Sequence, residues 1–277
     1  MDPLPLVVCG TAAALYALGR RGRVRVWREV SFYSGVAIAF VVLERPFDDW
    51  ADKWLSAHMA QHIVLMTVVP PLVVYGRPWP RMWLPFSLRA RRAVGRALSR
   101  SSSFRRGAGF FVLPWVALAV QSTMVAVWHV PRLYDAAVRN EWIHILEHVC
   151  FVAPALVFWG ALLEAPPVRA RTDHLRRCVW FVAAMVPSWI LAIYLAFAPA
   201  AVYSAYPSLT DQQLAAGIMW VPGSLTYFVA AFFFFYRWLA PSAAEGSAVS
   251  WPGVGGFAAD ASSLSPTEPR PEELSWT

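Results

Sequence analysis

Long apolar runs alternate with short polar segments along most of the chain. A helix needs about 20 consecutive, mainly apolar residues to cross a bilayer. Seven runs approach or exceed this length, and each is expected to form a membrane-spanning helix. Their expected bounds are 3–19, 29–47, 57–76, 108–130, 142–163, 178–199 and 214–239. The pattern therefore predicts an all-α integral membrane protein, a bundle of seven transmembrane helices.

The two ends of the chain differ from its middle. Asp2 rather than a basic segment precedes the first apolar run, and no cleavage-site pattern follows, so a retained span is expected and not a signal peptide. From Pro241 the chain is rich in Ser, Pro, Gly and Glu and loses its periodicity, which predicts a disordered tail. The expected organisation is a transmembrane domain over 1–240 and a cytoplasmic tail over 241–277.

Composition supports a membrane protein. Hydrophobic residues make up 58% of the chain and charged residues 15%, whereas an average soluble domain has about 25% charged residues. Such a composition rules out a disordered chain and disfavours an ordinary soluble enzyme. The net charge of +7 does not indicate nucleic acid as a partner, because the basic residues are almost all Arg and lie mainly between apolar runs.

Lys and Arg are concentrated in alternate loops. The segments 20–28, 77–107 and 164–177 contain five, nine and four of them, whereas the intervening loops contain two, two and none. Because basic loops stay on the cytoplasmic side, the N-terminus is expected outside and the C-terminus in the cytoplasm. The nine arginines of 77–107, which has no acidic residue, are expected to lie on anionic membrane lipids.

Histidines gather at the ends of the expected spans. His58 and His62 begin the third span, His144 and His148 begin the fifth, and His129 ends the fourth. Each pair has i,i+4 spacing, which places both imidazoles on one face of a helix. In the expected orientation all five lie at the outer side of the membrane. The sequence thus predicts that five imidazoles converge there.

Neutral imidazole is the commonest metal ligand and suits Cu, Zn, Fe and Ni. We therefore expect a metal site formed by the five histidines, although interfacial histidines that bond to carbonyls or lipid are the simpler interpretation. Thioethers suit Cu(I), and nearby polar groups can orient ligands. The candidate additional ligands or orienting groups are Met59, Gln61, Glu147, Asp211 and Met219.

Other metal chemistries remain open at this stage. A b-type haem needs one His from each of two facing helices, and this chain can provide both. His144, Glu147 and His148 match the inverted zinc-protease pattern, which is weak evidence alone. Cys9, Cys150 and Cys178 form no CxxC motif, so a thiolate zinc site is not indicated.

Several strings together resemble those of the multi-spanning CtaG family of bacterial cytochrome c oxidase (caa3-type) assembly factors. They are HMAQH at 58–62, PPL at 70–72, WHVPRLYD at 128–135, HILEH at 144–148 and DQQLAAGIMW at 211–220. The resemblance covers most of the expected membrane domain and is specific only in combination. The segment after about 240 is not covered.

The resemblance implies seven spans, the bacterial cytoplasmic membrane, and a role in producing active haem-copper oxidase. An oxidase subunit would then be the partner that accepts copper from this chain. A metallochaperone or assembly factor is accordingly expected rather than an enzyme. A haem-binding redox protein and a metal-free assembly scaffold are the alternatives.

Overall fold

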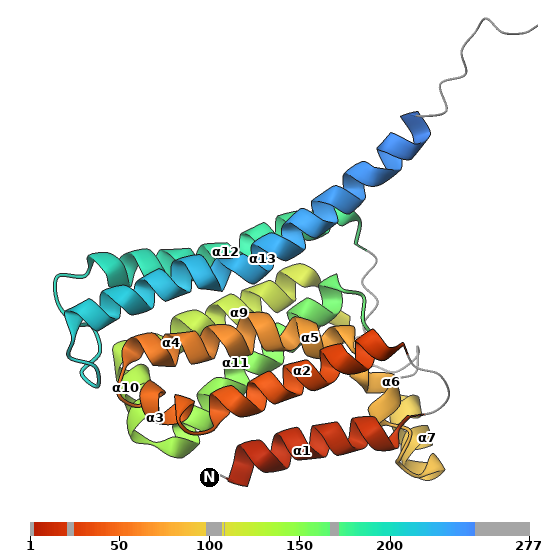
Figure 1. Cartoon of the computed structure of the whole chain (residues 1–277), viewed down its shortest axis with the longest axis horizontal. Helices are drawn as coiled ribbons and strands as arrows, with labels where there is room; N and C mark the ends of the chain where they lie inside the picture. Colours follow the sequence, from red (N-terminus) through yellow and green to blue (C-terminus); the bar gives the residue numbers. More distant parts are fainter. Residues whose placement is uncertain (1–2, 21–24, 98–106, 108, 167–171, 247–277) are drawn as a thin grey trace, which may run out of the picture. The chain divides into compact units, whose positions relative to one another are not determined.

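The computed structural model describes residues 3–20, 25–97, 107, 109–166 and 172–246. Within these residues the regular structure is entirely helical, with no strand, which confirms the all-α class (Figure 1). The chain divides into two compact units, Met1–Trp238 and Leu239–Thr277. The second unit contains the end of α13 (Leu209–Gly246), which continues past the expected boundary at 240. The rest of the expected tail, 247–277, lies outside the described residues.

Among the residues that the structure describes, five helical segments are long and apolar enough to cross a membrane. They are α2 (Val26–Leu43), the segment Leu55–Tyr75, α11 (Glu141–Leu162), α12 (His174–Phe197) and α13 over Leu209–Ala240. Two further apolar helices are shorter, α1 (Pro3–Leu18) and α9 (Pro114–Trp128). At 1.5 Å per residue these two rise about 24 and 22 Å, less than the roughly 30 Å hydrocarbon core of a bilayer. Length and composition thus indicate a membrane protein.

Proline corrects one expected boundary. The fourth span was expected to begin at 108, but α9 begins at Pro114, after Leu113 in an extended conformation (φ −61°, ψ 130°). A proline ring disfavours helical geometry at the preceding residue and is well tolerated at the first helical position. The second span also differs from expectation, because α2 ends at Leu43 and a short helix, α3 (Phe47–Ala51), follows.

The span Leu55–Tyr75 is not a uniform helix. It consists of α4 (Leu55–Ile63), a π-helical turn η1 (Val64–Val68) and α5 (Val69–Tyr75). Pro70 and Pro71 have no N–H to donate to the carbonyls four residues earlier, and their rings crowd those carbonyls. The wider π turn accommodates this conflict and changes the helical phase directly after the histidine-bearing helix α4.

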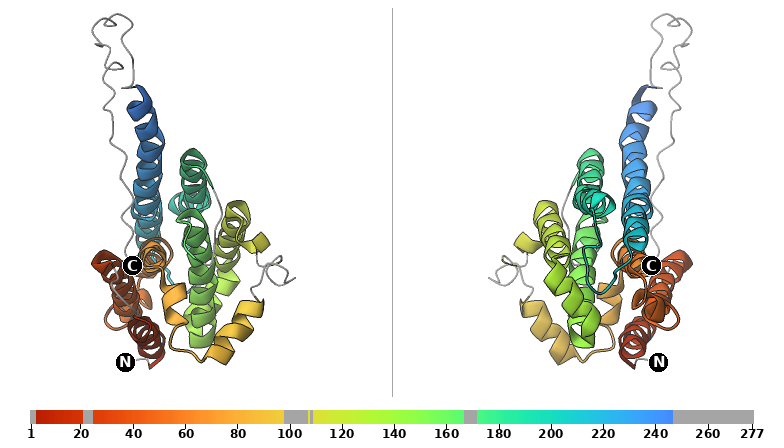
Figure 2. Two further views of the ribbon diagram at one scale, coloured as in Figure 1. Left: turned by 90° about the vertical axis from the view of Figure 1, so that its right-hand side faces the viewer. Right: turned by 90° about the vertical axis from the view of Figure 1, so that its left-hand side faces the viewer.

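The helices of the first unit pack lengthwise around α5, α9 and α11 (Figures 1 and 2). α5 contacts α2 and α11, α9 contacts α11 and α12, and α1 lies along α2. Hydrogen bonds join α12 to α13, including Trp189 Nε1 to Ser224 Oγ at 2.6 Å. The largest core cluster contains Phe158, Trp159, Phe181 and Tyr227, with the Trp159 and Tyr227 rings stacked 5.5 Å apart.

Paired charges lie beyond the C-terminal end of α5. In α6 (Pro78–Met82) the guanidinium of Arg81 lies 2.8 Å from Glu29 and 3.8 Å from the centre of the Tyr16 ring. Arg177 and Glu164 form a second ion pair. The arginine-rich α7 (Leu88–Ala97) follows α6 in the chain.

Candidate metal centre

Helix α4 presents two buried histidines one turn apart. His58 and His62 are 1% and 3% exposed, and their Nε2 atoms lie 3.1 Å apart. The ring centroids are separated by 4.3 Å with the planes nearly perpendicular. The i,i+4 spacing therefore brings two imidazole nitrogens together, as the sequence predicts.

Helix α11 brings the second pair to the same place. The ring of His144 lies 4.9 Å from that of His58, and the ring of His148 lies 5.1 Å from that of His62. One ligand atom each from His58, His62, His144 and Glu147 all lie within 4.8 Å of one another. We call these four residues the histidine cluster. The Glu147 side chain is fully buried within it.

His129 lies next to this cluster but outside it. It follows α9, where Pro131 starts the short helix α10 (Pro131–Arg139). Its Nδ1 lies 2.8 Å from the carbonyl oxygen of Val125 and must donate there, because a carbonyl only accepts. Its Nε2 therefore carries the lone pair, and this atom is buried without a hydrogen-bond partner.

A tyrosine fixes the tautomer of His58. Tyr206 Oη donates to the carbonyl oxygen of Ala51 at 2.6 Å and lies 3.0 Å from His58 Nδ1. Since the single phenol proton is used at Ala51, His58 Nδ1 must donate to the phenol oxygen. The lone pair of His58 is thus on Nε2, which faces His62. A second-sphere hydrogen bond of this kind is typical of metal-ligating histidines.

Polar atoms of this region are buried without partners in the part of the chain that the structure describes. They are His62 Nδ1, His129 Nε2, His144 Nε2, His148 Nε2, Tyr134 Oη and both carboxylate oxygens of Glu147. A buried polar group without a hydrogen bond costs about 1–3 kcal/mol. A bound cation is one kind of partner that such a concentration of unpartnered polar atoms could accept.

The spacing of the two α4 nitrogens also fits a cation. Imidazole nitrogens bind zinc at about 2.0–2.1 Å, so two ligands at near-tetrahedral angles lie roughly 3.1–3.4 Å apart. The His58 Nε2 to His62 Nε2 distance is 3.1 Å. The pair is therefore spaced for one ion of that size without moving the helix.

Two sequence candidates do not reach the cluster. Gln61 points toward α2 and donates to the Val42 carbonyl at 2.7 Å. Asp211, near the start of α13, accepts hydrogen bonds from the backbone N–H groups of Leu55 and Ser56 at 2.6 and 3.4 Å. Asp211 thus caps the first turn of α4 and holds the histidine-bearing helix against α13.

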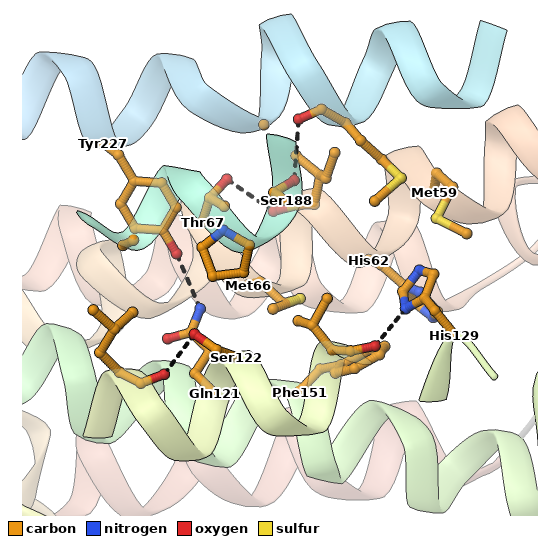
Figure 3. Close-up of a pocket in the computed structure, with 17 residues that line it drawn as sticks. Met59, His62, Met66, Thr67, Gln121, Ser122, His129, Phe151, Ser188 and Tyr227 are labelled. Carbon is orange, nitrogen blue, oxygen red and sulfur yellow. Dashed lines mark hydrogen bonds between the residues drawn. The ribbon is translucent and has the colours of Figure 1, made fainter. Parts of the chain in front are cut away.

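The methionine candidates lie on another side of the histidines. Met59 and Met219 line a cavity of about 60 Å³ together with His62, His129 and Met66 (Figure 3). Met124, a further apolar residue of α9, does not line it. The cavity extends from the histidines toward Gln121 and Tyr227.

Tyrosines of the connecting segments surround the histidines, and sequence reasoning missed them. Tyr134 lies 5.3 Å from the His58 ring and 5.7 Å from that of His129, and the Tyr203 ring lies 4.1 Å from Tyr134. Burial raises the pKa of Tyr134 and of Tyr206, so both phenols stay protonated. The sequence signal for them is the spacing Tyr203-x-x-Tyr206 in the loop 200–213.

Two carboxylates outside the spans, Asp52 and Asp135, lie in the segments near the histidines. Burial and the charge of Asp48 raise the pKa of Asp52, in the link before α4. Asp135 behaves in the opposite way, because hydrogen bonds from Ser204 and from the N–H of Ala205 outweigh its partial burial and lower its pKa. Asp135 thereby ties α10 to the loop that carries Tyr206.

Comparisons with known proteins identify two relatives of this chain. Two uncharacterized mycobacterial proteins, Mb0105 of Mycobacterium bovis and MT0111 of Mycobacterium tuberculosis, are each 24% identical to the chain over 228 residues. The matched region is 78% of this chain but only 34% of each relative, so the chain spans about a third of their length. No solved structure matches the chain.

One family model covers most of the molecule. It describes the cytochrome c oxidase caa3 assembly factor (Caa3_CtaG) and matches residues 12–240, which include every histidine discussed above. The resemblance seen in the sequence is thereby confirmed, and the chain belongs to the CtaG family of cytochrome c oxidase caa3 assembly factors.

Proposed function

We propose that the chain assists assembly of a haem-copper oxidase by holding copper at the histidine cluster and passing it to an oxidase subunit. The observation that carries this proposal is the group His58, His62, His144 and Glu147, whose ligand atoms lie within 4.8 Å of one another in a buried site. His148 is a further candidate ligand, since its ring lies 4.3 Å from that of His144 and 5.1 Å from that of His62. The family supplies the oxidase as partner.

The close packing of the imidazoles favours an ion over haem. In a bis-histidine haem the two axial nitrogens lie on opposite faces of a porphyrin. Here the pairs from the two facing helices, His58 with His144 and His62 with His148, have ring centroids only 4.9 and 5.1 Å apart, which is too close for a porphyrin between them. The neighbouring cavity, of about 60 Å³, also leaves no space for a macrocycle.

The donor set suits a metal that must be released. Imidazole and carboxylate ligands bind copper but, unlike a closed thiolate cage, exchange readily with an incoming acceptor. No substrate-binding or reactive group is needed for such a transfer. We accordingly assign the chain the role of a metallochaperone and not of an enzyme.

A second hollow offers cations a route to the cluster. A cavity of about 330 Å³ is lined mainly by apolar residues of α1, α2 and α11, and its wall also contains His144, His148, Asp48 and Glu141. Carboxylates at a hollow raise the local concentration of cations. This arrangement supports loading of copper from the side where α3 and α10 lie.

The proposed topology has seven spans in the bacterial cytoplasmic membrane. α1 and α9 then cross together with the five longer segments, since both are apolar and pack along α2 and α11. The basic segments 20–28, 77–107 and 164–177 would lie in the cytoplasm. The histidine cluster, the N-terminus and the acidic hollow would face outward, and the C-terminus would be cytoplasmic.

The test is copper analysis of the purified full chain, compared with a double variant, His58→Ala/His62→Ala. Structural sites with four ligands bind zinc with about 10–16 kcal/mol, or roughly 3 kcal/mol per ligand. Losing two ligands should therefore weaken copper binding by about four orders of magnitude. His174→Ala, at the start of α12, is the matched control and should bind copper like the wild type.

The same preparations separate the alternatives. Paired Soret and α absorption bands in the reduced protein would overturn the proposal in favour of haem. Oxidase activity that survives the double variant, at normal protein abundance in cells lacking the native protein, would instead favour a metal-free scaffold.

A further inference from the structure

We infer a second copper position, for Cu(I), in the cavity between α4, α9 and α13, held by His129 and by thioethers of Met59, Met66 and Met219. This inference rests on the proposed copper function and adds a separate site to it. The cavity shares only His62 with the histidine cluster, because His58, His144 and Glu147 do not line it.

The cavity has the size of a binding site for an ion and not for a molecule. Its volume is about 60 Å³, roughly the share of two waters in the liquid. Figure 3 shows Met59, Met66, His62 and His129 around this space; Met59 and His62 belong to α4, Met66 to η1, and His129 follows α9. Met59 and Met219 are 1% and 4% exposed, so neither thioether is a surface group.

Unpartnered polar atoms lie in the lining of this cavity. His129 is 8% exposed, and its Nε2 has no hydrogen bond because Nδ1 alone is used by Val125. Gln121 is 6% exposed and donates to Tyr227, while its Oε1 remains without a partner. A dry, purely apolar packing defect would not be lined by two such groups.

The ligand types select the ion. Thioether sulfur is a poor donor to hard cations but suits Cu(I), and imidazole completes a mixed nitrogen and sulfur set. The histidine cluster offers nitrogen and carboxylate oxygen instead. The two positions therefore differ in softness, with the cavity site preferring the reduced ion.

His62 lies between the two positions. Its Nε2 faces His58 and its Nδ1 has no partner. Copper can thus pass from the cluster to the cavity by stepwise exchange of ligands around one imidazole. The step transfers no electron, because copper remains Cu(I) throughout and only its ligands change.

The test is anaerobic loading of the full chain with Cu(I) in lipid nanodiscs, followed by elemental analysis and copper X-ray absorption. We expect two copper ions per chain and a sulfur shell at about 2.3 Å, the usual length of a metal–sulfur bond. The variant Met59→Leu/Met66→Leu/Met219→Leu should keep one copper ion and lose the sulfur shell. Met124→Leu and Met185→Leu are matched controls, since neither residue lines the cavity, and both should retain two ions.

A complementary variant still tests the second copper position if the triple substitution impairs folding. His58→Ala/His144→Ala removes ligands of the cluster only and should leave one copper ion with sulfur scattering. A wild-type protein with one ion and only nitrogen and oxygen scattering would overturn the second position and leave the proposed function intact. A wild-type protein that binds no copper would overturn both.

Discussion

The two ends of the span Leu55–Tyr75 differ in how their buried ionisable groups are paired. Beyond its C-terminal end, the guanidinium of Arg81 lies over the face of Tyr16 and pairs with the carboxylate of Glu29 through Nη2, although its Nε and Nη1 have no hydrogen-bond partner. Near its N-terminal end, His62 and Glu147 retain buried atoms with no partner. Both ends are buried, and they differ in that Arg81 has a partner of opposite charge whereas the carboxylate of Glu147 has none.

This difference separates architecture from function. A buried charge with an opposite charge beside it is neutralised within the protein, and its role is to hold helices in place. A group of unpaired lone pairs lowers stability, and an added cation would restore it. The comparison therefore predicts that substitutions at the paired end destabilise the metal-free protein, whereas suitable substitutions at the unpaired end stabilise it.

The largest effect is expected at the paired end. Arg81→Leu should lower the free energy of unfolding by about 3 kcal/mol, because it leaves Glu29 without its buried partner. The two side chains are 9% and 18% exposed. Thermal unfolding in detergent provides the measurement. Arg176→Leu is the control: its ion pair with Asp173 is 78% and 56% exposed, and no measurable change is expected.

At the unpaired end the sign should reverse. Glu147→Met replaces a fully buried carboxylate whose two oxygens have no partner. The metal-free protein should gain about 2 kcal/mol of stability, within the range for removing an unsatisfied buried group. Copper affinity should fall in the same variant. Glu141→Met, at an exposed position of α11, is a control for stability alone and should leave it unchanged; destabilisation by Glu147→Met would contradict the comparison.

A smaller effect is expected from the hydrogen bond that orients His58. Tyr206→Phe removes the acceptor 3.0 Å from His58 Nδ1, and loss of such a contact weakens metal binding by about tenfold or more. Copper titration against a competing chelator gives the change. Tyr203→Phe is the matched control, since Tyr203 Oη bonds to the backbone oxygen of His129 at 3.3 Å and not to a ring nitrogen. Equal losses of copper affinity in the two variants would show that Tyr206 does not orient His58.

A substitution at Asp211 tests whether this residue only caps α4, through hydrogen bonds with its backbone N–H groups, or also binds copper. Asp211→Ala removes the cap on Leu55 and Ser56 and should cost about 1 kcal/mol of stability. Copper stoichiometry should stay at the wild-type value, because the carboxylate bonds to α4 and not to the histidines. Loss of one copper ion from a folded Asp211→Ala protein would make Asp211 a ligand after all.

The helical class followed from the apolar runs, while the irregularities within it did not. Seven runs predicted seven helices of spanning length, but among the described residues five segments reach that length, while α1 and α9 are shorter and Pro114 sets the late start of α9. The π turn before Pro70 also has no periodic signature. Both features follow from the missing N–H and the ring of proline, which hydropathy does not register.

The site was partly predictable for a related reason. The i,i+4 histidine pairs fix side-chain directions locally, so the proximity of His58 and His62 was readable from spacing. The direction of Gln61 depends instead on the carbonyl of Val42, on another helix. The role of Tyr206 likewise depends on Ala51, more than 150 positions away. Such partners are set by tertiary packing, which one sequence does not give.

The smallest effect concerns pH at the loop beside the site. Hydrogen bonds from Ser204 and Ala205 lower the pKa of Asp135 in the folded protein, despite partial burial. Its carboxylate therefore contributes stability that is present above the unfolded pKa of about 3.9 and is lost as pH falls through the lower folded value. The melting-temperature difference between wild type and Asp135→Asn should be constant from about pH 5 to 8 and shrink below about pH 4, where protonation removes the advantage of the charged form. Asp49→Asn, at an exposed ion pair with Arg45, should show a difference near zero throughout. A difference for Asp135→Asn that grows on acidification would mean that the hydrogen bonds favour the neutral acid, and that Asp135 does not fasten this loop as a carboxylate.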